Sequence, residues 1–259
     1  YDVVFQDIEN TLYYFSNNGD FMWKKELPNQ IIGDIQQIDI YKNGRLQLLF
    51  RTIDNLYLLD RNGNEVDELT FKIESGIINN PVSVFDYEKN RNYRIVLSSD
   101  SKIAMFDSRG KIVTGFKPES INSNIVQSPV HIRIKGKDYI VIQLQNGDLK
   151  ILNRRGQERV RINDKIDFGF NQVFSYMDSF LTSDKLGNLI RISEDGEVEK
   201  INIGSDTNTF LSVYNNNLVH LNNKLNLSSR LVMNHYVLPY LYSESTSLVV
   251  KNFCSFLCG

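Results

Sequence analysis

The loop from Asp86 to Asn92 carries the side chains that calcium chemistry would need. Its oxygen-bearing residues stand at alternate positions: Asp86, Glu88, Asn90 and Asn92. Calcium takes about six to eight oxygen ligands, and short loops often supply several of them. Lys89 and Arg91 lie between these residues, however, and the glycine that makes the sharp turn of such loops is absent. We therefore expect a solvated loop, keep calcium binding as the less favoured interpretation, and assign no metal site.

The densest basic stretch of the chain surrounds a predicted turn. It contains Arg154, Arg155, Arg159 and Arg161, with Lys150 nearby. Guanidinium groups pair with carboxylates and phosphates through two parallel hydrogen bonds, so such a stretch can bind an acidic partner. Charges at a hairpin turn more commonly form a solvated surface. The four arginines are nevertheless the candidate partner-binding residues that the sequence offers.

Catalytic patterns find little support in the sequence. No serine lies in a Gly-x-Ser-x-Gly turn, and no Gly-x-x-x-x-Gly-Lys loop is present. His131 alternates with Val130 and Ile132 on a predicted strand, where it could face a central channel but where a single histidine is more often structural. Carboxylate pairs for glycoside hydrolysis cannot be recognised when they come from distant parts of a chain. We predict no catalytic residue and no cofactor.

Two cysteines, Cys254 and Cys258, lie four residues apart near the C-terminus. Structural zinc sites need a complete tetrahedral set of ligands, and the three histidines of the chain show no ligand spacing around this pair. A disulfide or two buried thiols is the simpler interpretation. The redox compartment stays open.

Composition narrows the class of partner. The formal net charge is −2 and no long run of Lys or Arg occurs, so the electrostatic signature of nucleic-acid binding is missing. No apolar stretch is long enough to span a bilayer, and no signal peptide is recognisable. Hydrophobic residues make up 41% of the chain, which predicts a folded protein with a sizeable core.

A repeat organises the elements that must carry these side chains. A short apolar strand ends in Ser, Asp or Asn, and two further residues and a glycine follow it. The pattern occurs five times, at 12–19, 56–63, 103–110, 149–156 and 189–196, with its glycines 44, 47, 46 and 40 residues apart. Glycine adopts the positive φ angles that tight hairpins need. Each copy therefore predicts a β-hairpin.

Two more strands precede most of these hairpins, for example residues 82–87 and 94–99 before Ile103. Four short antiparallel strands every 40 to 47 residues are typical of the blades of a β-propeller. We predict an all-β propeller of four-stranded blades, with six blades favoured and seven as the alternative. The later blades are expected at 34–73, 80–117, 128–162, 171–203 and, in degraded form, 208–243.

The first blade, residues 3–27, has only three predicted strands. Because an open ring would leave an unpaired edge, we expect the C-terminal run Ser247–Asn252 to close the ring beside Val3–Gln6. Residues 1–259 would then form a single propeller domain. The chain begins at Tyr1 rather than Met, and we expect it to be a fragment of a longer protein.

This repeat resembles the pyrroloquinoline-quinone-type, WD-repeat-like propeller repeat. The segments Asp39–Phe50, Leu56–Gly63 and Ile151–Gly156 are also similar to uncharacterised envelope-associated propeller proteins of Bacteroidetes-type bacteria. The resemblance covers nearly the whole chain and implies a periplasmic or cell-envelope location. Quinone-dependent members use several tryptophans, whereas this chain has only Trp23; a quinone cofactor is therefore not expected.

The function expected from these observations is non-catalytic binding or scaffolding, with a surface for a protein or glycan partner. The alternative is a carbohydrate-active or quinone-type propeller enzyme. An enzyme should gather acidic or histidine side chains with shifted pKa values at one site, whereas a binding module should present an apolar or aromatic patch.

Overall fold

Every described residue with regular structure lies in a β-strand, apart from one turn of 3-10 helix at Asp67–Leu69. The computed structural model describes residues 2–73, 80–119, 121–203, 209–214, 217–221, 225–228 and 235–237. The chain divides into two compact units, one formed by residues 1–131 and 138–159 and the other by residues 132–137 and 160–259. No helix in the described ranges is long and apolar enough to cross a bilayer.

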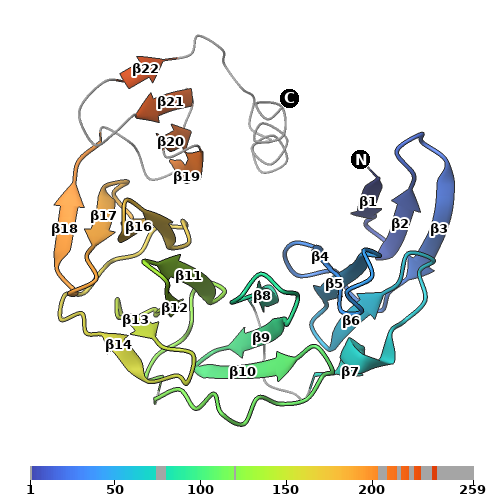
Figure 1. The fold of residues 1–259 in the computed structure, drawn as a ribbon. Helices are drawn as coiled ribbons and strands as arrows, with labels where there is room; N and C mark the ends of the chain where they lie inside the picture. The colour runs from blue at the N-terminus through green and yellow to red at the C-terminus, as the bar shows by residue number, and fades with distance from the viewer. Residues whose placement is uncertain are drawn as a thin grey trace. The chain divides into compact units, whose positions relative to one another are not determined.

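The described strands form six sheets, each built from strands that follow one another along the chain (Figure 1). The first sheet contains β1 (Val3–Gln6), β2 (Thr11–Phe15) and β3 (Phe21–Glu26), and the second contains β4 (Gln36–Ile38), β5 (Gln47–Arg51), β6 (Asn55–Leu59) and β7 (Phe71–Lys72). The third contains β8 (Ser83–Phe85), β9 (Arg94–Ser99) and β10 (Lys102–Asp107).

The remaining three sheets have four strands each. The fourth contains β11 (Val130–Ile134), β12 (Lys137–Gln143), β13 (Leu149–Leu152) and β14 (Glu158–Val160). The fifth contains β15 (Phe174–Tyr176), β16 (Ser179–Ser183), β17 (Leu189–Ile192) and β18 (Val198–Ile201). The sixth contains β19 (Phe210–Tyr214), β20 (Asn217–Leu221), β21 (Leu225–Ser228) and β22 (His235–Val237). The predicted all-β repeat is confirmed.

The third sheet differs from the predicted four strands. After the turn at Gly110, only Ile112 forms a bridge, with Phe106, and the Val113 N–H donates to the Met105 carbonyl at 2.8 Å. The chain then turns at Val113, whose carbonyl accepts from the Phe116 N–H. The described residues that follow Gly110 therefore form an isolated bridge and a turn in place of a fourth strand. The proposed closing strand Ser247–Asn252 and both cysteines lie outside the described residues.

The repeated hairpins owe their shape to one polar side chain at the end of each strand. Asp60 Oδ1 accepts hydrogen bonds from the Asn62 and Asn64 N–H groups, both at 2.8 Å. Asp107, Asn153, Ser16 and Ser193 do the same in their own turns. This explains why the sequence repeat requires Asp, Asn or Ser, because these short side chains satisfy backbone donors of the turn.

The glycine of four of the five turns also lies close to an earlier segment of the chain. A Cβ atom at Gly63 would lie 2.8 Å from the Trp23 ring, and one at Gly110 would lie 1.9 Å from the Glu68 carbonyl oxygen. Gly156 and Gly196 are crowded in the same way by Pro118 and by the Arg161 carbonyl. At Gly19, in the first sheet, no atom of the described part of the chain lies within 4 Å of such a Cβ. Turn and sheet packing therefore impose the same residue.

The cores lie between successive sheets. In one unit, separate apolar clusters join the first sheet to the second, the second to the third and the third to the fourth. In the other unit, Leu181 and Leu189 of the fifth sheet pack with Leu211 and Leu218 of the sixth. Face-to-face burial of short sheets is how propeller blades stabilise one another, because no blade can bury its apolar faces alone.

Candidate binding groove

Arg154, the first of the predicted binding arginines, is already engaged by other residues of the chain. Its Nε donates to Asp138 Oδ2 at 2.8 Å, and its Nη1 pairs with Glu88. The guanidinium also lies 4.4 Å above the Tyr87 ring centre, within the range of a cation–π contact. These anionic partners offset the charge of Arg154, which ties the β13–β14 turn to the loop between β8 and β9.

The other three arginines occupy separate positions. Arg159 lies on β14 with its guanidinium 5.4 Å from the Tyr139 ring centre. The Arg155 side chain is exposed in the turn, and Arg161 belongs to the other unit of the chain. Arg154, Arg155 and Arg159 thus have three different surroundings. Their role in partner binding stays a prediction.

The loop that resembles a calcium site is held by its own hydrogen bonds. Asp86 Oδ1 and Oδ2 accept from the backbone N–H groups of Asn90 and Arg91, and Asn90 Oδ1 accepts from the Asn92 N–H. The oxygens therefore cap backbone donors of the loop. Among the residues that the structure describes, no group of three or more His, Cys, Asp or Glu side chains is placed to hold a metal ion.

His131 contacts a buried acid. Its Nε2 lies 2.8 Å from Asp138 Oδ1, and its ring meets the Tyr87 ring edge-to-face at 4.8 Å. Burial opposes ionisation of Asp138, but hydrogen bonds from His131 and Arg154 outweigh it, so the pKa of Asp138 is lowered. The side chain of His131 is 14% exposed and that of Asp138 8%. This geometry fits the structural interpretation of His131.

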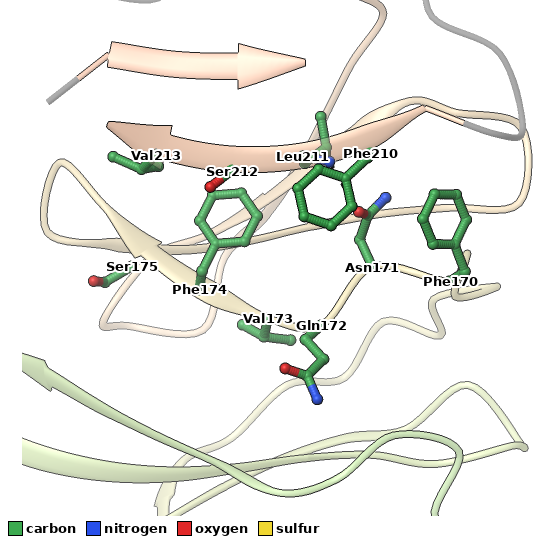
Figure 2. A pocket seen from close by; sticks show the side chains of 10 residues that line it. All are labelled: Phe170, Asn171, Gln172, Val173, Phe174, Ser175, Phe210, Leu211, Ser212 and Val213. Atoms are coloured by element: carbon green, nitrogen blue, oxygen red, sulfur yellow. Dashed lines mark hydrogen bonds between the residues drawn. The ribbon is translucent and has the colours of Figure 1, made fainter. Parts of the chain in front are cut away.

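A groove whose described lining residues are all uncharged lies between the fifth and sixth sheets. Residues 170–175 form one wall and residues 210–213 the other, around a cavity of about 580 Å³. Volumes of this size are typical of ligand-binding sites. In Figure 2 the Phe174 ring points towards Ser212 and the Phe210 ring lies beside Asn171, with Phe170 at one end.

Both walls come from strands that begin their sheets. β15 and the segment before it supply residues 170–175, and β19 supplies residues 210–213. Phe170 is 47% exposed and Phe210 38%, whereas Leu211 is buried in the core between the two sheets. Exposed aromatic side chains beside a cavity are a feature of interaction sites.

Asn171 joins the two walls. Its Nδ2 donates to Ser183 Oγ at 2.7 Å and to the Thr209 carbonyl at 2.9 Å, and its Oδ1 accepts from the Leu211 N–H at 2.9 Å. The amide therefore pairs with the chain at β19 much as a strand backbone would. Because Asn171 is 4% exposed and both of its N–H donors are used, it holds the groove in shape.

Sequence reasoning missed this groove, although one signal for Asn171 was present. Asn80 stands three residues before β8, as Asn171 stands three residues before β15. Its Nδ2 likewise donates to a serine of the next strand, Ser98, and to a carbonyl further along the chain, Ile125. An asparagine at this position of the repeat marks a link between sheets.

Comparison with known proteins supports the fold alone. No protein-family model and no curated protein matches the sequence. Three similar solved structures are BamB from Moraxella catarrhalis, BBS1N in complex with ARL6DN, and the dihydro-heme d1 dehydrogenase NirN. BamB has a TM-score of 0.62 and 12% identity, over 94% of this chain and 73% of its own. BBS1N has a TM-score of 0.65 and 12% identity, over 93% of this chain and 77% of its own. NirN has a TM-score of 0.56 and 11% identity, over 95% of this chain and 56% of its own. The fold is that of β-propeller proteins.

Proposed function

We propose that this chain is a non-catalytic propeller that binds a protein partner through the groove between β15 and β19. The observation that carries the proposal is the lining itself, in which all ten side chains are apolar or neutral and polar. General acid–base or nucleophilic chemistry needs titratable groups within hydrogen-bond reach of a substrate. This cavity offers aromatic surface, which favours binding over reaction.

Two further points support binding. When a partner covers exposed phenyl rings, the complex is stabilised by roughly 25 cal/mol for each Å² of apolar area buried. The likeness to BBS1N, which was solved in complex with ARL6DN, is consistent with partner binding by such a fold. Because the fold is also shared with a dehydrogenase, the groove rather than the fold carries the argument.

The ring closure expected from the sequence belongs to the same proposal. We propose one domain over residues 1–259, with six blades and Ser247–Asn252 beside β1. The support is that, among the residues that the structure describes, β1 has a single neighbour, β2, and the first sheet has three strands. The test is a series of double variants, each with Val4→Cys and one further cysteine at a position from 247 to 252. One of these pairs is expected to form a specific disulfide. The absence of a disulfide in every variant would contradict closure.

The finer resemblance is also kept as a proposal. The repeat of strand, Asp or Asn, two residues and glycine suggests the pyrroloquinoline-quinone-type class, and with it a place in a bacterial cell envelope. Fractionation of native cells tests this location directly. Recovery of the chain with the cytosol would contradict it, and would leave the groove and its binding role untouched.

Photo-cross-linking from the groove tests the binding function. A benzophenone amino acid in place of Ser212 is expected to trap one partner in native cells, and the same group at the exposed Glu197 should not. The Phe210→Ala substitution should abolish the Ser212 adduct, because it removes the exposed phenyl ring from that wall of the groove. Adducts that are identical at both positions, or that survive Phe210→Ala, would contradict the proposal.

A further inference from the structure

The groove is flanked by strands that end their sheets. β15 pairs with β16 and β19 pairs with β20, and each is the first strand in its sheet order. The backbone groups of an edge strand form a template for another extended chain. Recognition domains use this template to bind peptides, with hydrogen bonds supplied by the backbone and selectivity by side-chain pockets.

The register of β15 shows which backbone groups point towards an added strand. Tyr176 pairs with Ser179 across the two-residue turn Met177–Asp178, whose φ angles are +46° and +58°. The pair that flanks such a turn is hydrogen-bonded, and the next pair, Ser175 with Phe180, is not. The N–H and C=O of Ser175 therefore point away from β16, along the edge that borders the groove.

The opposite wall is less able to accept a strand at its start. Asn171 already bonds the Thr209 carbonyl and the Leu211 N–H. An incoming chain would have to displace a buried amide to pair there, which would leave buried polar groups without partners. The edge of β15 is thus the better template.

The side chains favour an uncharged occupant with large apolar groups. The described lining of the groove has Phe170, Phe174 and Phe210 but no charged side chain. A charged side chain that entered between these residues would lose its hydration without gaining an ion pair from them. A glycan would need many hydrogen bonds to its hydroxyl groups. The amide of Asn171 is already hydrogen-bonded within the chain. The other polar side chains of the described lining are those of Gln172, Ser175 and Ser212.

Resting on the proposed function, we infer that the groove binds an extended, uncharged polypeptide segment that pairs with Ser175 on the edge of β15. Its alternate side chains are aromatic or large aliphatic, because every second residue of a strand faces the same side. The phenyl rings of Phe170 and Phe210 contact these side chains. The occupant is thus defined by a backbone edge and an apolar pocket together.

A short synthetic peptide tests this inference. The probe is the capped peptide Ser-Phe-Val-Phe-Ser, added to the full chain while backbone amide signals are followed by NMR. We expect saturable shifts at Ser175 and Ser212. The Phe170→Ala substitution should weaken binding at least tenfold, whereas Phe21→Ala should leave it unchanged; Phe21 is a 56% exposed phenyl in the first sheet.

Control ligands separate the possible outcomes. Peptides with Ala or Glu in place of both Phe residues, and the glycan cellohexaose, should bind at least tenfold more weakly. Equal binding of the glycan, binding that persists in Phe170→Ala, or no Ser175 shift at peptide saturation would overturn the inference. If these results occur while the Ser212 cross-link still traps a protein, the binding function stands and the extended-peptide ligand is wrong.

Discussion

The first and second sheets carry the same hairpin turn in different surroundings. Gly63 of the second sheet lies under the Trp23 ring, whose Nε1 donates to the Arg61 carbonyl at 2.9 Å. Gly19 of the first sheet has open space where a Cβ would stand. In the first sheet, the residues Val3, Phe5 and Phe21 are 53%, 46% and 56% exposed. The local sequence builds the turn in both, and the neighbouring sheet adds the second constraint only at Gly63.

Substitution of a crowded turn glycine should have the largest effect. Gly110→Ala places a methyl group 1.9 Å from the Glu68 carbonyl oxygen, at a φ of +69°. Because backbone must move to relieve this clash, we expect a loss of more than about 4 kcal/mol in the free energy of unfolding. Urea denaturation measures it. The strain of a positive φ alone costs up to about 2 kcal/mol. A loss below that value would show that the turn at Gly110 does not pack closely against Glu68.

The Trp23 contact should give a smaller, coupled effect. Gly63→Ala meets the face of an indole ring rather than backbone, so we expect a loss of about 3 kcal/mol from backbone strain and overpacking together. In a Trp23→Ala background the same substitution should cost about 1–2 kcal/mol less, because its obstacle is gone. Additive losses in the double-mutant cycle would contradict direct packing of the turn on the first sheet.

The polar link around Asp138, which joins the fourth sheet to the β8–β9 loop through Arg154 and Glu88, should depend on pH. Folding lowers the pKa of Asp138, so the ionised carboxylate stabilises the fold above its unfolded pKa of about 3.9. This contribution is lost as the pH falls through the lower folded pKa, where Asp138 becomes protonated beside His131 and Arg154. Asp138→Asn should therefore be less stable than the parent at pH 7, and the difference should shrink below pH 4. A constant difference in urea melts from pH 3 to 7 would argue against this link.

The smallest effect is expected at Gly19. Its φ of +85° makes alanine unfavourable, but no neighbouring atom adds to the strain. We expect a loss of about 1–2 kcal/mol. Comparison with Gly110→Ala by urea denaturation is the internal control. An equal loss at both positions would mean that something covers the first sheet as closely as Glu68 covers Gly110.

Much of this fold could be predicted because its signals are local. The Asp60 and Asn153 side chains cap their own turns, and Gly63 and Gly156 take positive φ angles that few other residues adopt. Repetition of such short-range patterns marks each hairpin. The missing fourth strand of the third sheet could not be predicted, because it depends on where the chain turns after Val113.

The groove was harder to predict because its parts are distant in sequence. Phe174 and Phe210 are 36 positions apart, and each taken alone fits a strand residue of the core. Their exposure depends on how the fifth and sixth sheets pack around Asn171. The cluster of basic residues suggested a binding site in the sequence. Arg154 is instead paired with Asp138 and Glu88, and such pairing is visible only in a structure.

In the proposed function the groove, and not the exposed apolar surface of the first sheet, binds the partner. The direct test compares two exposed phenylalanines: Phe210 in the groove, 38% exposed, and Phe21 on β3, 56% exposed. The affinity of the full chain for the partner trapped from Ser212 should fall at least tenfold with Phe210→Ala and stay unchanged with Phe21→Ala. The reverse result would place the binding surface on the first sheet and contradict the account.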